Sequence, residues 1–501
     1  MTGVRWPIIL AVILTAVLEV LDMTIVNVAL PHIKAAFGLA NDQTVWIVTS
    51  YIVASVAVMP LTGFFVRRVG RRRLITTAIT GFAMFSMLGG ASWSVGSIVL
   101  FRIGQGLFGA FLIPLSQSIL FDAFPRDKRG QAMALFGLGV VAAPVFGPTL
   151  GALLTEYFSW RAVFYVNLPM AAFALMMIAG ELERDEIKRL PVDWAGLALM
   201  VTAIGCLQMT LDLGESHDWF ASRFIQITAL GAVFAGAVFV IRGWSKPDNI
   251  VDFSLLKDRS FAAANVAIMG FGVAMFGAIA ILPLFVQGLL GYPVLDAGFL
   301  FIPRGIAAGF SMVITGAVLV SRLDPRALAV LGLTLTGAGN ILLSQVTLDA
   351  GFWNLAWPGV VSGLGMGLFF VPMSTLAFQN IGSDRQDEAS GIYGVTRSIG
   401  SSIGIAIIGW QLARRTQVHW ALLGEHLTPY GSGVARYLAP LHLTPSSAAG
   451  AAHLAETLQV QASMLAFQDA FLLAGLAALA MIPAVLLLQK PRQAAPVPMA
   501  A

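Results

Sequence analysis

Residues 7–30 read PIILAVILTAVLEVLDMTIVNVAL, an apolar run in which Glu19 and Asp22 are the only charged side chains. A helix of about 20 apolar residues crosses the ~30 Å hydrocarbon core of a bilayer. The run is too long for the core of a signal peptide, so we expect it to remain in the protein as a first membrane-spanning helix. Two carboxylates inside such a helix are costly and indicate a specific role.

Runs of this kind recur along the chain. Of its 501 residues, 57% are apolar and 11% are charged, whereas soluble domains carry about 25% charged residues. This composition excludes a soluble protein and predicts an all-α polytopic membrane protein. Polar breaks and Gly or Pro residues divide the chain into fourteen predicted spans: 7–30, 44–66, 74–93, 97–120, 131–155, 162–180, 194–212, 222–242, 261–289, 296–320, 327–346, 355–378, 390–412 and 466–488.

The basic residues indicate the orientation of these spans. If both termini are cytoplasmic, 21 of the 30 Lys and Arg residues fall in inside segments, six fall in outside segments and three lie within spans. Cytoplasmic loops carry the excess of Lys and Arg in membrane proteins, so we expect both termini in the cytoplasm. The net charge of +4 therefore reflects topology and gives no indication of a nucleic-acid partner.

An internal repeat indicates two related halves. GAFLIPLS at 109–116 matches GLFFVPMS at 367–374, with Gly, Phe, Pro and Ser in step. Repeated halves are typical of secondary transporters, although a chance match is the alternative. The predicted organisation is a six-helix bundle over 1–193, two inserted spans with a linker over 194–260, and a second six-helix bundle over 261–501.

One outer loop, 413–465, is distinguished by its length. It holds four of the six histidines, without the spacing of metal ligands. Its end, at about 447–463, is rich in Ala and favours a helix. We expect this end to extend the last span outward as a surface for a partner.

Glu19 and Asp22 are three residues apart and share one face of the first helix. Burial and the neighbouring carboxylate favour the protonated form, so both are candidates for binding and releasing a proton. A structural carboxylate, hydrogen-bonded between helices, is the alternative, and Glu19 is also a candidate contact for a cationic substrate. Arg102, with Gln105 after it, can pair with a carboxylate or extend to the membrane interface.

Other intramembrane features carry two interpretations each. Arg304 and Arg397 are candidates for a substrate-binding or a gating role. The fifth span contains Pro144, Gly147, Pro148 and Gly151. Prolines bend a helix and glycines admit a close neighbour, so this pattern predicts either a seal of the outer pathway against proton leak or a simple packing kink.

The loop between the second and third spans is short and strongly basic. It contains Gly63, Arg67, Arg68, Gly70, Arg71, Arg72 and Arg73. Its charge marks the cytoplasmic side. It can also bridge helix ends as a conformational latch, through helix carbonyls or loop acids such as Asp127.

Motifs of other function classes are missing from the sequence. No phosphate-binding GxxxxGK[ST] loop, nucleophile triad or metal signature occurs, so we expect neither an enzyme nor an ATP-driven pump. The single cysteine, Cys206, excludes an intramolecular disulfide. Transport would then use an ion gradient or run downhill, without a cofactor.

Four motifs resemble the major facilitator superfamily, and specifically its fourteen-helix drug:proton antiporters of the EmrB/QacA type. LDMTIVNVALP at 21–31 resembles the first-helix signature of that family. The loop at 63–73 resembles G-x-L-a-D-R-x-G-R-R. Residues 102–109 resemble R-x-x-Q-G-x-x-G, and GPTLG at 147–151 resembles the antiporter motif G-P-x-x-G.

Two positions depart from the family pattern. Arg67 stands at the acidic position of the basic loop, so the charge-relay latch credited to that Asp cannot operate in its usual form. Ala152 stands where a final glycine is expected. Within the family the chain looks closest to the EmrB members, through PLSQS at 114–118, Leu211-Asp212 before DWF at 218–220, and the large outer loop.

The resemblance implies a set of roles. It implies proton coupling by Asp22, Glu19 and Arg102, and a substrate cavity with Asn27, Gln105, Arg304 and Arg397 as candidates. It implies an antiporter motif at Pro144, Gly147, Pro148 and Gly151, and a cytoplasmic gating loop at Gly63, Arg68, Gly70 and Arg71. It further implies a bacterial inner membrane, a periplasmic adaptor protein and an outer-membrane channel as partners.

We therefore expect a proton-coupled multidrug efflux transporter that exports small amphipathic or hydrophobic compounds by alternating access, as the inner-membrane part of a tripartite pump. The alternatives are a single-component exporter of a specific metabolite, a non-transporting membrane ligand sensor, and an importer by symport. The acidic residues of the first helix argue against a sensor, and GPTLG argues against symport by resemblance.

Overall fold

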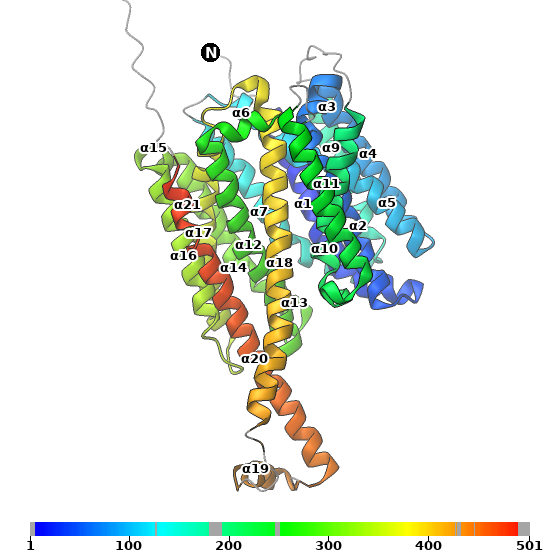
Figure 1. Ribbon diagram of the computed structural model, residues 1–501, viewed down its shortest axis with the longest axis vertical. Helices are drawn as coiled ribbons and strands as arrows, with labels where there is room; N and C mark the ends of the chain where they lie inside the picture. The colour runs from blue at the N-terminus through cyan, green and yellow to red at the C-terminus, as the bar shows by residue number, and fades with distance from the viewer. Residues whose placement is uncertain are drawn as a thin grey trace, which may run out of the picture.

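The computed structural model describes residues 6–125, 128–179, 193–245, 251–425, 427, 432–444 and 446–488. Regular secondary structure in these ranges is helical, with no strand. The helices form an upright bundle with a narrow helical extension at one end (Figure 1). α1 (Trp6–Phe37) begins and α21 (Ile482–Leu486) ends at the opposite end of the bundle (Figure 1).

The first half of the bundle is built around α1, which packs on α6, α7 and α9, while α5 packs on α2 and α4. Gly70, between α3 and α4, has a φ of 89°, a left-handed conformation that favours glycine, and it turns the chain there. The further helices of this half are α2 (Asn41–Val58), η1 (Met59–Leu61), α3 (Thr62–Val69), α4 (Arg71–Gly90), α5 (Val95–Gly109), α6 (Leu112–Ala123), α7 (Arg129–Tyr157), α8 (Ala162–Tyr165) and α9 (Asn167–Ala179).

The inserted pair consists of α10 (Trp194–Leu213) and α11 (Arg223–Ser245), joined through η3 (Glu215–His217) and η4 (Trp219–Ala221). α10 packs on α2 of the first half and on α18 of the second, so the pair lies beside the seam between the halves.

The second half is held together by contacts of α12 with α18, of α17 with α14 and α16, and of α20 with α18. Its helices are η5 (Phe253–Lys257), α12 (Arg259–Pro283), η6 (Leu284–Leu289), α13 (Val294–Phe299), α14 (Phe301–Ile314), η7 (Thr315–Leu319), α15 (Val320–Arg322), α16 (Pro325–Leu343), α17 (Phe352–Ala377), η8 (Ser383–Arg385), α18 (Gln386–Gly424), α19 (Ser432–Leu438), η9 (Ala439–Leu441), α20 (Ala448–Leu479) and α21.

The predicted spans correspond to helices. Twelve helices in the described residues are long and apolar enough to cross a membrane. The other two predicted spans, 74–93 and 162–180, correspond to α4, which falls outside that set of twelve, and to the shorter apolar helical stretch Ala162–Ile178. The all-α membrane architecture is thus confirmed, and the count of fourteen spans stays a prediction.

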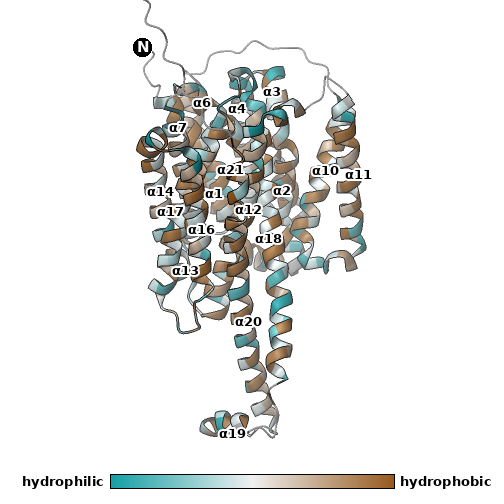
Figure 2. Ribbon diagram, turned by 60° about the vertical axis from the view of Figure 1, so that its left-hand side comes forward, coloured by the Kyte–Doolittle hydropathy of each residue, from teal (hydrophilic) through white to brown (hydrophobic). Residues whose placement is uncertain are grey.

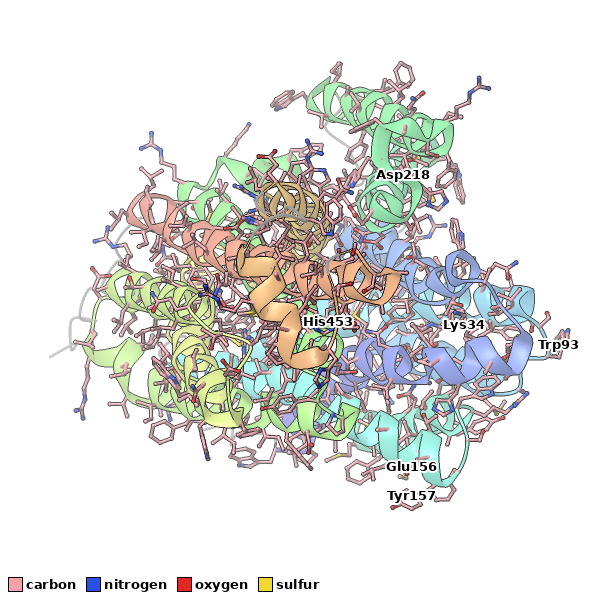
Figure 3. The ribbon with its side chains drawn as sticks, turned by 90° about the horizontal axis from the view of Figure 1, so that it is seen from below. Lys34, Trp93, Glu156, Tyr157, Asp218 and His453 are labelled. Carbon is pink, nitrogen blue, oxygen red and sulfur yellow. The ribbon has the colours of Figure 1, made fainter. Side chains whose placement is uncertain are left out.

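The surface chemistry agrees with a membrane-embedded bundle. Figure 2 shows apolar residues through the body of the bundle, with hydrophilic residues around α3 and along the parts of α18 and α20 that extend below it. Trp93 is 74% exposed and lies at the rim in the view from below (Figure 3). Such tryptophans favour the interface between lipid and water.

The two ends of the bundle differ. We call the end at which α3 lies the basic end, and the end from which α18 and α20 extend the stalk end. At the basic end α3, η1 and α6 of the first half pack on α18 of the second, and the rings of Phe121 and Phe378 are 4.8 Å apart. The halves are therefore closed against each other at the basic end.

The segment 413–465 is largely helical, which corrects the loop expected over its first part and confirms the helix expected at about 447–463. α18 continues for 39 residues to Gly424 and α20 has 32 residues. Both extend beyond the bundle and α19 lies at the tip (Figures 1 and 2). The residues after 412 are mostly good helix formers, so the span continues as a helix into the polar region. We call this extension, residues 413–465, the stalk.

Glycines set the distance between α16 and α17. A Cβ atom on Gly365 would lie 2.5 Å from the carbonyl oxygen of Gly332 and 2.5 Å from the Oγ1 atom of Thr336. Small residues permit close approach of membrane helices, whose association depends on packing.

We expect Gly365→Val to lower the thermal stability of the detergent-solubilised protein, because overpacking a well-packed core costs about 1–3 kcal/mol. Gly409→Val is the matched control, since nothing lies within 4 Å of a Cβ atom at that position. Unfolding followed by tryptophan fluorescence compares the two variants. Equal melting temperatures would contradict the close α16–α17 contact.

Candidate functional site

Asp22 on α1 and Arg102 on α5 form an ion pair inside the first half. The Nη1 atom of Arg102 donates to Oδ2 of Asp22 at 2.5 Å, and their side chains are 1% and 0% exposed, respectively. The same nitrogen donates to Oε1 of Gln105 at 2.8 Å, and Nε2 of Gln105 donates to Oδ1 of Asp22 at 2.9 Å. The predicted pairing of Arg102 is confirmed, and its alternative extension to the membrane interface is wrong.

A second donor reaches Asp22 from α9. Nδ2 of Asn167 donates to Oδ1 of Asp22 at 2.7 Å and lies 3.0 Å from Oγ of Ser86 on α4. The Ser86 hydroxyl donates to the carbonyl oxygen of Phe164 at 2.8 Å. Asp22 thus joins α1 to α5, and through Asn167 to α9 and α4.

Arg102 is held from its other side by α2. Its Nε atom donates to the carbonyl oxygen of Ile47 at 3.1 Å. Its guanidinium carbon lies 4.2 Å from the centre of the Tyr51 ring, a cation–π arrangement. A Cβ atom on Gly106 would lie 2.4 Å from the carbonyl oxygen of Tyr51, so the glycine permits this approach of α5 to α2. We call Asp22, Arg102, Gln105, Asn167 and Tyr51 the carboxylate network.

Glu19 lies one turn from Asp22 but outside this network. Its Oε2 atom accepts the backbone N–H of Ile113 at 3.0 Å. That N–H lies at the start of α6, where the fourth span breaks after α5, and helix N-termini offer unpaired N–H groups. The other oxygen, Oε1, is buried without a hydrogen-bond partner in the described residues. The two neighbouring carboxylates therefore have different environments: an ion pair for Asp22 and a helix N-terminus for Glu19.

The remaining substrate candidates lie apart from the carboxylate network. Arg397 on α18 belongs to the second half, yet its charge acts on Glu19 across the seam. Arg304 on α14 is 6% exposed and buried within the second half. Asn27 is exposed, and its side chain forms no hydrogen bond with the described residues.

The antiporter motif packs α7 against α1 beside Asp22. A Cβ atom on Gly147 would lie 2.1 Å from Oγ1 of Thr24, and one on Gly151 would lie 2.9 Å from the carbonyl oxygen of Ile25. α7 continues as a helix through Pro144 and Pro148. It also packs on α14 and α17 of the second half. α7 thus lies between the carboxylate-bearing helix and the other half.

Ion pairs close the basic end across the halves. Nη1 of Arg67 lies 2.6 Å from Oε2 of Glu388, and Nη2 of Arg71 lies 2.8 Å from Oδ2 of Asp387. Arg71 also pairs with Asp122 at 2.6 Å. We call these five residues the basic-end clasp. In this chain Arg67 occupies the position that is acidic in the family pattern. The acids of the clasp that face its two arginines from α18 are Asp387 and Glu388.

Other predicted gating residues differ in their surroundings. A Cβ atom on Gly63 would lie 2.5 Å from Cβ of Glu388, so this glycine lets α3 approach α18. Arg68 is exposed and pairs with no carboxylate of the described residues. Asp127, named above as a partner of the basic loop, lies outside the described residues.

The linker after the inserted pair joins the clasp. The N–H of Asp252 donates to Oε1 of Glu388 at 2.7 Å, and its carboxylate pairs with Arg385. Partial burial alone would raise the pKa of Asp252, but hydrogen bonds from Ser254 and the charge of Arg385 outweigh it and lower that pKa. The Asp252 carboxylate is therefore charged, and able to bind Arg385, throughout the physiological pH range.

Sequence reasoning missed several of these partners. Asn167 carried only a weak signal, a single polar residue near the start of an apolar span. Asp387 and Glu388 were placed before a span predicted to begin at 390, whereas α18 begins at Gln386. The pairing of these two acids with Arg67 and Arg71 depends on the packing of α18 against α3 and α6, which the sequence does not show.

Comparison with known proteins places this geometry in a family. The family model described as Major Facilitator Superfamily matches residues 12–405. The chain is a member of the major facilitator superfamily. It is 33% identical over 484 residues to the fatty acid resistance protein FarB of Neisseria gonorrhoeae, covering 95% of each chain. It is 34% identical over 427 residues to the multidrug export protein EmrB of Escherichia coli K12, covering 84% of this chain and 83% of that protein.

Solved structures agree on the fold. The human organic anion transporter MFSD10 has a TM-score of 0.60 at 15% identity, covering 95% of this chain and 99% of that chain. The proton:xylose symporter XylE has a TM-score of 0.59 at 14% identity, covering 95% of both chains. The predicted resemblance to the superfamily and to its EmrB-type members is confirmed. The protein is thus a multi-pass protein of a bacterial inner membrane, with a transporter fold.

We expect Arg102→Gln to destabilise this major facilitator protein strongly, because removing one partner of a buried ion pair costs about 3–5 kcal/mol. The double variant Asp22→Asn with Arg102→Gln should lose less stability than the sum of the two single variants, since it leaves no unpaired buried charge. Melting temperatures of the purified proteins test this. Additive losses would contradict a direct coupling of Asp22 and Arg102.

Proposed function

We propose that this transporter exports small amphipathic compounds in exchange for protons. The observation that carries the proposal is the buried ion pair of Asp22 and Arg102, 2.5 Å apart. Such a pair is favourable only while both partners are charged. A proton on Asp22 removes the charge that attracts Arg102 and so weakens the hold of α5 on α1, although the neutral acid can still accept the hydrogen bond from Gln105. Protonation of Asp22 would thereby change the contacts between α1 and α5.

The same change can reach the other half through α7. Thr24 and Ile25, two and three residues after Asp22, contact Gly147 and Gly151 of α7. α7 in turn packs on α14. A displacement of α1 at Asp22 would therefore shift α7 against the second half, which is the relative motion that alternating access requires.

Glu19 supplies a second group for the cycle. It is fully buried, with one hydrogen bond and one unpaired oxygen, which is costly for an ionised carboxylate. When ionised, Glu19 on α1 of the first half is attracted by the charge of Arg397 on α18 of the second half. Protonation of Glu19 would weaken this attraction across the seam and favour separation of the halves around it.

The direction of export follows from orientation. The basic end carries the clasp and most of the Lys and Arg residues, so we assign it to the cytoplasm. With the clasp formed, the cytoplasmic side is closed, and outward release of substrate would precede the opening of the clasp. The energy source in this proposal is the proton gradient, without a cofactor.

The substrate class is inferred from composition and relatives. The chain contains 33 Phe and 19 Met, and such side chains can adapt an apolar cavity to varied shapes. Its relatives are named for multidrug export and for fatty acid resistance, and a 28% identical relative in Acinetobacter baumannii for colistin resistance. These names support amphipathic compounds as substrates here.

The stalk supports a tripartite arrangement with a periplasmic adaptor and an outer-membrane channel. Between α18 and α20 it has a groove of about 560 Å³, whose lining includes Trp420, Gln459 and Phe467. Trp420 is 44% exposed, and exposed aromatic residues next to a groove are typical of protein interfaces. A single-component exporter is the alternative, and direct crosslinking of the stalk to a periplasmic protein would argue against it.

Proton movement in inside-out vesicles tests the antiport. In vesicles loaded to an acidic interior, addition of an amphipathic substrate should release protons, and Asp22→Asn should reduce this release to background because its side chain cannot bind a proton. Asp296→Asn is the matched control, since that carboxylate is exposed at the stalk end and should leave the release unchanged. A pH-sensitive dye outside the vesicles reports the movement.

Binding of a compound without any proton movement in the wild type would overturn the proposal. It would favour the non-transporting sensor as the function of this fold.

A further inference from the structure

The charges inside the spans are compensated unequally. Asp22 and Arg102 form an ion pair, whereas Glu19 and Arg397 form no ion pair and attract each other only at longer range, across the seam. Arg304 has no such counterpart: its side chain is 94% buried, and no described residue forms a hydrogen bond or ion pair with it. Its positive charge therefore has no carboxylate partner among the described residues of the second half.

The sequence of the second half explains why no partner reaches Arg304. α12, α14, α16 and α17 contain no Asp or Glu, and the acids of α7 and α13 beside α14, Glu156 and Asp296, are exposed at the stalk end. α18 has acids only in its first turn, at Asp387 and Glu388. Both of these belong to the basic-end clasp. Arg304 lies about 27 Å along its helical run from Arg322 at the basic end, at 1.5 Å per residue. The acids of the clasp are therefore engaged at the far end of the span.

A buried guanidinium without a counter-charge is costly, and such groups in membrane spans mark substrate or ion pathways. Arginine offers a planar, forked set of donors that matches the two oxygens of a carboxylate. Arg304 remains charged under all physiological conditions. The missing component at this position is an anion.

The surroundings of Arg304 add an apolar side to the site. Leu300, one turn before it, belongs to a buried apolar cluster with Leu355 and Ala356 at the start of α17. On α17, a Cβ atom on Gly359 would lie 3.6 Å from Cβ of Arg304. Helix α14 therefore places one cation against the glycine face of α17 and one turn from a buried apolar cluster, a combination of charge and apolar surroundings that suits a molecule with an acidic head and an apolar body.

We infer that Arg304 is the binding subsite for the acidic head group of an amphipathic anion. The inference rests on the proposed export function and narrows it: the protein prefers amphipathic acids over neutral or cationic compounds of the same apolar size. The head group is a carboxylate or a comparable anion, carried either by a free amphiphile or by a membrane lipid.

Binding to the full-length protein in zwitterionic lipid nanodiscs tests this subsite. The probes are dodecanoate, its uncharged methyl ester and dodecylamine, all below their micelle-forming concentrations. We expect wild type to bind dodecanoate most tightly, and Arg304→Gln to weaken it at least about tenfold while leaving the ester unchanged, because only the acid forms the charge-assisted hydrogen bonds. Arg304→Lys should recover part of the affinity, since it keeps the charge but loses the fork.

Arg322→Gln is the matched control, an exposed arginine at the basic end of the same helical run. It should bind all three probes as wild type does. A repeat in nanodiscs with anionic lipid distinguishes the two sources of the head group: competition by the lipid would assign the subsite to lipid and overturn the substrate preference. Equal affinity of wild type for acid and ester, or unchanged acid binding in Arg304→Gln and Arg304→Lys, would overturn the subsite.

Failure of this inference is distinct from failure of the antiport. Substrate-driven proton release with no preference for the acid would leave the antiporter intact and refute the subsite. Arg304-dependent binding of the acid with no proton release would support the subsite and refute the antiporter.

Discussion

The buried ion pair of Asp22 and Arg102 is the interaction on which the first half depends. Two charges removed from water are stable only if each satisfies the other and their remaining hydrogen-bonding atoms find partners. Gln105, Asn167 and Tyr51 supply contacts to the pair from three helices, and of the pair's own polar side-chain atoms only Nη2 of Arg102 has no hydrogen-bond partner in the described residues. The pair therefore fixes how α1, α2, α5 and α9 are arranged, and it makes that arrangement sensitive to a single proton.

The seam between the halves is controlled by the same kind of interaction at two depths. At the basic end the clasp joins Arg67 and Arg71 to acids of α18. Deeper in the membrane, Arg397 of α18 attracts Glu19 of α1 at longer range, without forming an ion pair. The clasp keeps an ionic bridge even though Arg67 replaces the acidic residue of the family pattern, because Glu388 supplies the opposite charge. Between the two levels α7 packs on α1 and α14, so motion of one half is transmitted by packing as well as by charge.

The sequence predicted the features that depend on composition and spacing. The sequence was enough to predict the spans, the basic loop, the pairing of Arg102 with a carboxylate and the family. Long apolar runs and isolated intramembrane charges have few physical explanations. Partners that meet only through tertiary contact could not be predicted from the sequence. Asn167 reaches Asp22 from a helix 145 residues away. The first part of the stalk, where α18 continues to Gly424, was expected as a loop because its polar residues hide a continuous helix. The environment of Glu19 depends on a break in the fourth span, which hydropathy cannot locate.

The central claim is that protonation of Asp22 moves the two halves relative to each other. The most direct test measures the distance between spin labels at Tyr157 and Trp353, which are exposed at the stalk ends of α7 and α17, in a Cys206→Ser background. In wild type the distance distribution should shift between mildly alkaline and acidic pH. In Asp22→Asn it should stay close to the acidic wild-type distribution at every pH, because that side chain mimics the protonated acid. A shift in Asp22→Asn equal to that of wild type would contradict the account.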